Sequence, residues 1–332
     1  MDSSTLLWLR IIQAHAPREL APLARALAMS AIGTGDRISA GESVGVRQSE
    51  ETITELVLLE LAQTVPGLRI RTLKHSEETA EGADWEWWIE GTGGWFHFLV
   101  QAKRIHWKSD GTGTYDLGYR PRARRGDPPR LRQIDTLLDT ARTTGTPAIY
   151  ALYNQADSAG PYSQTSCFCA PALPAGIDGV TAIAASTARR LLDAPGVSNA
   201  PINLQAVRPY AAPWSCLATC FGRGGGMGIG WWPHAPWNDG PAEPGGPDGD
   251  AAAAAASFVA SLSLRTEPRA DFRADSLDDI SLVSDGFRRE PPPYVPLVSG
   301  DELHPSNQLP HPLARQGRAP RFVVAQYRSV DQ

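Results

Sequence analysis

Residues 82–104 read GADWEWWIEGTGGWFHFLVQAKR, and this segment has the clearest structural pattern in the chain. Two runs rich in aromatic and β-branched residues flank the turn GTGG, which is the pattern of a β-hairpin. Alternation places the apolar residues of the second run on one face, directed at a core: Phe96, Phe98, Val100 and Ala102. Gln101 and Lys103 then share the opposite face.

The turn also predicts the register of this hairpin. If its centre lies between Thr92 and Gly93, Asp84 stands directly opposite Gln101, with the two Cβ atoms about 5 Å apart on the same face. Lys103 lies one pleat further along that face. A carboxylate, an amide oxygen and an ammonium group are therefore predicted to meet at one end of the hairpin.

These three groups suit the hydrolysis of a phosphodiester. That reaction needs a divalent cation to polarise the phosphate and to lower the pKa of a bound water. Mg²⁺, or Mn²⁺ in its place, prefers oxygen ligands, which Asp84, Gln101 and the backbone carbonyl of Ala102 can supply. Lys103 can orient the attacking water or stabilise charge that develops on the phosphate. We therefore expect Asp84, Gln101 and Lys103 to be catalytic.

The arrangement of Asp84, a returning strand and Gln101-Ala-Lys103 resembles the PD-(D/E)XK nuclease superfamily. It is similar to the Mrr-like branch, in which Gln often replaces the acidic residue. The block GADWEWW…VQAKR also resembles an uncharacterised family of bacterial proteins. The superfamily resemblance covers roughly residues 45–155 and implies an α/β, restriction-endonuclease-like core, with a central mixed sheet flanked by helices and a site at the strand ends.

The resemblance also implies a further ligand and shows two departures. A helix before the core commonly adds a Glu ligand, and Glu51 or Glu55 is expected in that role, with Glu51 preferred. Gly82-Ala83 stands where the family often has Pro or a small residue. Gln101 leaves one fewer charge on the metal, so weak metal binding or an inactive site is the alternative.

The rest of the chain divides into three predicted regions. These are an N-terminal helical segment (1–44), the nuclease-like core (45–200) and a loop-rich, Gly- and Pro-rich C-terminal region of uncertain fold (201–332). Periodicity and capping predict helices at 4–30, 50–63, 131–145 and 251–264, and a strand passing into a helix at 180–193. Strands are expected at 68–73 and 148–154, with a last strand at a sheet edge at 320–329. Residues 33–45, GTGDRISAGESVG, are expected to form a loop.

Two further residues of the hairpin have simpler expectations. Glu86 shares the Asp84 face, and a surface position is expected for it. His97 shares the Gln101 face, and a structural role is expected for it.

Charge is unevenly distributed along the chain. The net charge is −5, which is not typical of a nucleic-acid-binding protein. Residues 103–132 nevertheless hold nine basic residues against three Asp. We expect this segment to bind the nucleic-acid backbone, since an acidic protein must concentrate positive charge where it holds a polyanion. The expected contacts are Arg104, Lys108, Arg122, Arg124, Arg125 and Gln133.

The expected function is a metal-dependent nuclease that acts on DNA, and a role in bacterial defence is implied by the resemblance alone. A catalytically inactive nucleic-acid-binding or sensing module on the same fold is one alternative. A structural or interaction protein is another. The four cysteines suit reduced thiols in a cytoplasmic protein, with a zinc site as the alternative. No apolar run reaches the length of a membrane span.

Overall fold

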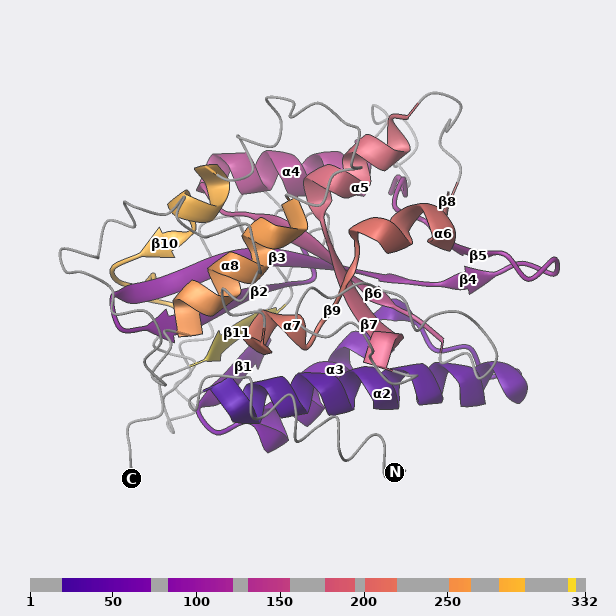
Figure 1. Ribbon diagram of the computed structural model, residues 1–332, viewed down its shortest axis with the longest axis horizontal. Coiled ribbons are helices and arrows are strands. Elements are labelled where there is room, and N and C mark those ends of the chain that lie inside the picture. Colours follow the sequence, from indigo (N-terminus) through magenta and orange to yellow (C-terminus); the bar gives the residue numbers. More distant parts are fainter. Residues whose placement is uncertain are drawn as a thin grey trace.

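The computed structural model describes eight ranges of the chain: residues 20–72, 83–121, 131–155, 177–194, 201–219, 251–263, 281–295 and 322–326. Within these ranges no helix combines the length and the apolar character needed to cross a bilayer. The described residues form an α/β structure in which a central, mixed, eight-stranded sheet packs against helices (Figure 1). This coarse fold class is the predicted one.

The central sheet has the strand order β1-β11-β2-β3-β6-β7-β9, and β10 pairs with β3. Its strands are β1 (Leu68–Thr72), β2 (Trp85–Gly91), β3 (Gly94–Arg104), β6 (Ala148–Tyr153), β7 (Val180–Ala184), β9 (Ala212–Pro213), β10 (Phe287–Arg288) and β11 (Phe322–Gln326). The pair β3 and β6 is parallel, as is the pair β11 and β2, whereas the other pairs are antiparallel. Because β3 and β6 are parallel, their carboxyl ends lie at the same edge of the sheet.

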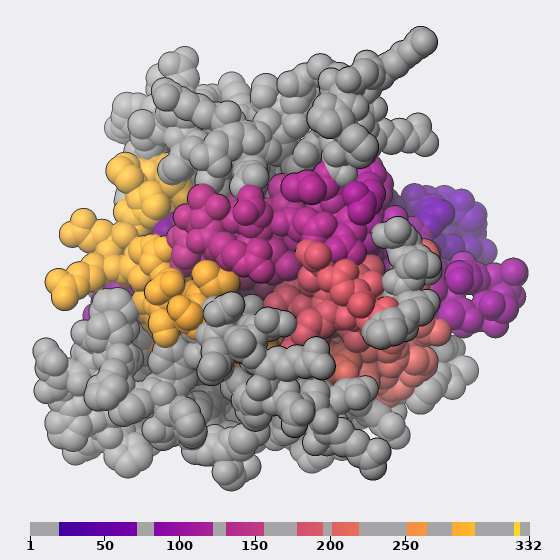
Figure 2. Space-filling view, turned by 90° about the horizontal axis from the view of Figure 1, so that it is seen from above, coloured from indigo at the N-terminus to yellow at the C-terminus, as the bar shows by residue number. Residues whose placement is uncertain are grey.

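A smaller three-stranded sheet extends from that edge. It comprises β4 (His106–Trp107), β5 (Gly113–Tyr115) and β8 (Ile202–Asn203), in the order β4-β5-β8. Strand β4 follows β3 after one residue, so the small sheet continues directly from the end of β3. The β4–β5 hairpin projects from one end of the molecule, beside the face that carries the helix at 133–144 (Figures 1 and 2).

Helices cover both faces of the central sheet. Helices α2 (Ala21–Ser43), α3 (Glu50–Thr64), α7 (Cys216–Thr219) and α8 (Ala251–Ser263) contribute to the larger apolar core. Helices α4 (Gln133–Thr144), α5 (Ala185–Leu192) and α6 (Leu204–Val207) contribute to the core on the other face. Figure 1 shows α2 and α3 on one side of the sheet and α4 and α5 on the other.

The hairpin register agrees with the prediction. Trp85 pairs with Val100 and Gly91 with Gly94, so continuing the register places Asp84 opposite Gln101. The apolar side chains of β3 that were assigned to one face all lie in the larger core: Phe96, Phe98, Val100 and Ala102. The helices predicted near residues 50, 131, 185 and 251 are also present, and the Ser49 side chain caps α3 by accepting from the Thr52 amide at 3.2 Å.

The predicted loop at 33–45 was wrong, because α2 continues to Ser43. Glycine usually destabilises a helix interior, but here close packing compensates. A Cβ on Gly179 would lie 2.0 Å from the Ala31 carbonyl and 2.8 Å from the Gly35 amide nitrogen, so the backbones of α2 and the turn at 177–179 touch. A side chain on Gly41 would likewise meet the Val46 carbonyl at 2.5 Å.

The last strand is present, but the prediction that it lies at a sheet edge was wrong. β11 lies between β1 and β2, antiparallel to β1 and parallel to β2. Strand β11 therefore belongs to the central sheet, and residues of α7, α8 and β11 share the larger core with residues of β2, β3, β6 and β7, although they come after residue 200.

Candidate active site

Asp84 stands immediately before β2, at the start of the hairpin. The Ala102 amide donates to its Oδ2 atom at 2.7 Å, and the Gln101 side-chain amide donates to the same atom at 2.5 Å. The Asp84 amide itself donates to the Val100 carbonyl at 2.9 Å. These three bonds fix the carboxylate against the end of β3, on the face that alternation predicted.

Gln101 is 1% exposed and its side chain is only half satisfied. Its Nε2 atom also lies 3.3 Å from the Ala102 carbonyl oxygen, while its Oε1 atom has no partner among the described residues. A buried amide oxygen without a partner costs free energy. Oε1 and Nε2 are distinguished by their hydrogen bonds alone, because a flip of the amide exchanges them.

Lys103 is 5% exposed, and its ammonium pairs with Glu50 Oε2 at 3.1 Å. Glu50 Oε1 also accepts from the Arg104 amide at 3.1 Å. The helix therefore does bring a glutamate to the site, but it is Glu50, the first residue of α3, and not Glu51 or Glu55. Both of those side chains are exposed, because each helical residue turns by about 100° and successive glutamates face different directions.

The protein around the Asp84 carboxyl perturbs its acidity. Burial raises the pKa of Asp84 to about 6, although the Lys103 ammonium and the hydrogen bond from the Ala102 amide act in the opposite direction. Tyr150, the neighbour of Gln101 on β6, is fully buried, and its hydroxyl has no partner among the described residues. Burial, followed by the negative charge of Asp84, raises the Tyr150 pKa well above its usual value, so the phenol keeps its proton.

The predicted nucleic-acid contacts are placed in different environments. Gln133 is buried at the start of α4. Its backbone N–H donates to the Tyr119 carbonyl at 2.9 Å, and its side-chain Oε1 has no partner among the described residues. Lys108 is exposed on the β4–β5 hairpin. The predicted contact of Arg104 with nucleic acid is corrected, because Arg104 is 3% exposed and its guanidinium pairs with Glu42 inside the protein. Arg122, Arg124 and Arg125 lie outside the described residues.

A second polar cluster occupies the same face of the hairpin. His97 Nε2 pairs with Glu86 Oε2 at 2.8 Å, and His97 Nδ1 lies 3.0 Å from the Thr146 hydroxyl. The imidazole stacks on Trp88 with 4.0 Å between ring centroids. Glu86 is fully buried, which corrects the predicted surface position, whereas His97 has the expected structural surroundings.

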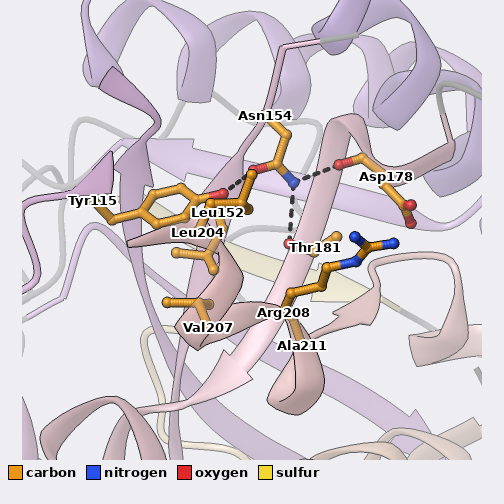
Figure 3. A pocket seen from close by; sticks show the side chains of 9 residues that line it. All are labelled: Tyr115, Leu152, Asn154, Asp178, Thr181, Leu204, Val207, Arg208 and Ala211. Atoms are coloured by element: carbon orange, nitrogen blue, oxygen red, sulfur yellow. Dashed lines mark hydrogen bonds between the residues drawn. The ribbon is translucent and has the colours of Figure 1, made fainter. Parts of the chain in front are cut away.

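A small cavity lies at the end of β6, where Leu152 and Asn154 line it (Figure 3). Asn154 crosses it: the Tyr115 hydroxyl donates to its Oδ1, and its Nδ2 donates to the Asp178 carbonyl and to Thr181 Oγ1, the latter at 3.2 Å. The amide of Asn154 is thus fully used by its neighbours. Gln101 Oε1 and the Tyr150 hydroxyl, which have no partner among the described residues, lie instead on the paired strands next to Asp84.

The donor set around Asp84 fits a hard divalent cation. Among the described residues no group of three or more His, Cys, Asp or Glu side chains is placed to hold a metal, so a zinc-type cluster is not formed there. Cys216 is buried, and the other three cysteines lie outside the described residues. The Gln101 side-chain NH₂ group donates to Asp84 Oδ2 and to the Ala102 carbonyl oxygen. Its positively polarised hydrogens occupy the place that a cation would take between these two oxygens. Flipping that amide would present three oxygens to one point, the ligand type that Mg²⁺ prefers.

Three residues at this site were missed by sequence reasoning. Glu50 could not be separated from Glu51, because both lie in the first turn of the predicted helix. Tyr150 becomes a neighbour of Gln101 only through the parallel pairing of β3 and β6. Tyr119 comes from a connection without periodicity, and its ring lies 5.5 Å from Lys103 Nζ.

Comparisons with curated proteins and with solved structures each found no match. One family model does match, over residues 23–331, a range that includes the β2–β3 hairpin and every strand of the central sheet. The chain therefore belongs to DUF6615, a family of unknown function.

Proposed function

We propose that this protein is a divalent-metal-dependent nuclease that hydrolyses phosphodiester bonds in DNA. One observation carries the proposal: Asp84, Gln101, the Ala102 carbonyl, Lys103 and Glu50 converge at the carboxyl end of β3. The mixed sheet, with helices on both faces and this cluster at the strand ends, is also what a restriction-endonuclease-like core implies. That finer fold assignment is part of the proposal.

Asp84 Oδ2, Gln101 Oε1 and the Ala102 carbonyl oxygen would hold the cation, Mg²⁺ or Mn²⁺. When bound, such an ion polarises a phosphoryl oxygen and makes a bound water a better nucleophile. The assignment requires the flipped Gln101 amide, which turns Oε1 towards Asp84 Oδ2 and the Ala102 carbonyl oxygen, the two atoms that Nε2 now approaches.

The remaining groups bind and orient the phosphate and the attacking water. Lys103 is a buried cation held by Glu50, so its ammonium has a fixed position from which to neutralise developing negative charge. Glu50 can accept a hydrogen bond from a water between it and Asp84. The Tyr150 phenol keeps its proton and can donate to an oxygen at the same place.

A catalytically inactive, DNA-binding module is the second candidate. The observation that favours it is the small number of carboxylates, since Gln101 replaces an acid and Glu50 is already paired with Lys103. This module would bind DNA with the same residues but would not cleave it.

Cleavage of supercoiled and linear DNA, with Mg²⁺, with Mn²⁺ and with EDTA, separates these candidates. We expect cation-dependent cleavage that Asp84→Asn and Lys103→Ala each reduce by at least about 100-fold, as is typical when a preorganised electrostatic group is removed. Asp139→Asn, an exposed acid on α4, is the matched control and should retain activity.

Far-UV circular dichroism must show that each variant is folded. Full cleavage by folded Asp84→Asn contradicts the nuclease proposal. DNA binding without cleavage by the wild type, under every cation tried, favours the inactive module.

A further inference from the structure

Tyr119 lies at the mouth of the proposed site. Its backbone carbonyl accepts from the Gln133 amide at 2.9 Å, which ties it to the start of α4. Its ring lies over the Lys103 ammonium, with 5.5 Å between Nζ and the ring centroid. The residue is nevertheless 44% exposed. One face of the ring therefore meets the site, and much of the remaining surface is open to solvent.

A second exposed aromatic residue follows Lys103 on the β4–β5 hairpin. Trp107 is 37% exposed, and its ring packs over Gly113, where an added Cβ would lie 3.2 Å from it. Lys108 and Arg47 are exposed in the same part of the molecule, and Arg47 contacts His106 of β4. Exposed aromatic rings interleaved with cations thus border the end of β3.

This combination is complementary to an unpaired polynucleotide strand. Proteins bind single strands by pairing a positively charged path for the backbone with aromatic side chains on which bases stack. A base inside a duplex is already stacked on both faces and paired. It would have to leave the helix to reach a side chain, at a cost of a few kcal/mol.

We infer that Tyr119 is the base-stacking residue of the site, so that the phosphodiester held at Lys103 belongs to an unpaired strand and not to an intact duplex. This inference rests on the proposed nuclease function and specifies its substrate. A base stacked on the open face of Tyr119 would carry its own phosphate towards the ammonium on the other face.

Binding measured in the Asp84→Asn background tests the inference without cleavage. Fluorescence anisotropy would compare a labelled single-stranded oligodeoxynucleotide with a blunt hairpin duplex of the same sequence. Tyr119→Ala is expected to weaken single-strand binding by roughly 10-fold, which is typical of losing one stacked base, and to change duplex binding by less than about twofold. Tyr119→Phe should keep both affinities, because it keeps the ring. Leu59→Ala, an exposed apolar residue in the second half of α3, is the matched control.

The ratio of the two affinities separates stacking from an indirect effect through Lys103. An equal loss on both ligands, or no loss on either, overturns the inference and leaves the nuclease proposal standing. Loss of single-strand affinity in Tyr119→Phe as well as in Tyr119→Ala also overturns it, since the ring alone would not explain the effect. If the parent protein binds neither ligand, the inference and the proposed function fail together.

Discussion

The β2–β3 hairpin carries two polar clusters on one face, and they differ in which of their groups have partners and in where they lie on the strands. In the cluster of Glu86, His97 and Thr146, both imidazole nitrogens have partners, and the Tyr294 hydroxyl adds a hydrogen bond to Glu86. In the cluster around Asp84, the Gln101 carbonyl oxygen and the Tyr150 hydroxyl are buried without a partner among the described residues.

The two clusters also differ in their position on the hairpin. Glu86 and His97 lie under Trp88 and Tyr294, in the middle of the strands. Asp84 and Gln101 lie where β2 begins and β3 nears its end, next to the exposed β4–β5 hairpin. Groups paired by their own chain stabilise the fold, whereas a buried unpartnered group close to an exposed surface can be completed by a ligand. The position of Asp84 at the strand ends, together with the unpartnered Gln101 and Tyr150 atoms beside it, favours the proposed functional role for the second cluster.

The largest expected effect on stability comes from Glu86→Ala. The change leaves the His97 and Tyr294 donors buried without their acceptor, which should lower the free energy of unfolding by roughly 3 kcal/mol. Thermal unfolding followed by circular dichroism measures it, with Asp84→Asn, two residues earlier on the same face, as the comparison. We expect Asp84→Asn to be at least as stable as the wild type when no cation is bound. If the two variants are equally destabilised, the division into a structural and a functional cluster is wrong.

The next effect sharpens the same contrast by adding the cation. A ligand that binds only the folded state stabilises it by about 2.7 kcal/mol at one hundred times its Kd. Mg²⁺ should therefore raise the melting temperature of the wild type and of Glu86→Ala, since that variant keeps the Asp84 cluster. Asp84→Asn should not respond. A similar Mg²⁺ response in all three proteins would place the cation elsewhere.

The part of this site that follows from short-range pattern was predictable. The GTGG turn and the alternation of residues 95–102 determine the register, and the register alone brings Asp84, Gln101 and Lys103 to one face. The helix at Glu50–Thr64 was also predictable from its Ser49 cap and its position before Pro66. Both are local features, in which neighbouring residues determine the geometry.

The rest depends on contacts between distant segments. Nothing near residue 322 indicates that β11 inserts between β1 and β2, because its two partners lie more than two hundred residues earlier. The choice of Glu50 over Glu51 depends on how α3 is rotated against β3, which helical periodicity does not resolve when two glutamates adjoin. The glycines of α2 suggested a loop, because the close approach of Gly179 to Ala31 and Gly35 joins segments that are far apart in the sequence.

The last prediction concerns the pH dependence of the metal-free protein. Burial raises the pKa of Asp84 to about 6 from 3.8, so the folded state holds this proton more tightly than the unfolded state does. The stability that Asp84 contributes is then complete below its unfolded pKa and is lost as the pH rises through about 6. Asp84→Asn cannot lose a proton. In EDTA it should therefore become more stable than the wild type above about pH 6, while the two proteins converge in acid.

Melting temperatures of both proteins, measured from roughly pH 4 to pH 8, test this sign. Saturating Mg²⁺ is the control, because a cation needs the ionised carboxylate and should reverse the order of the two proteins above about pH 6. Parallel curves in EDTA would mean that the folded protein does not disfavour the Asp84 carboxylate. If the wild type is instead the more stable protein in Mg²⁺, the Asp84 carboxylate that lowers stability in the metal-free chain is also the group that binds the cation.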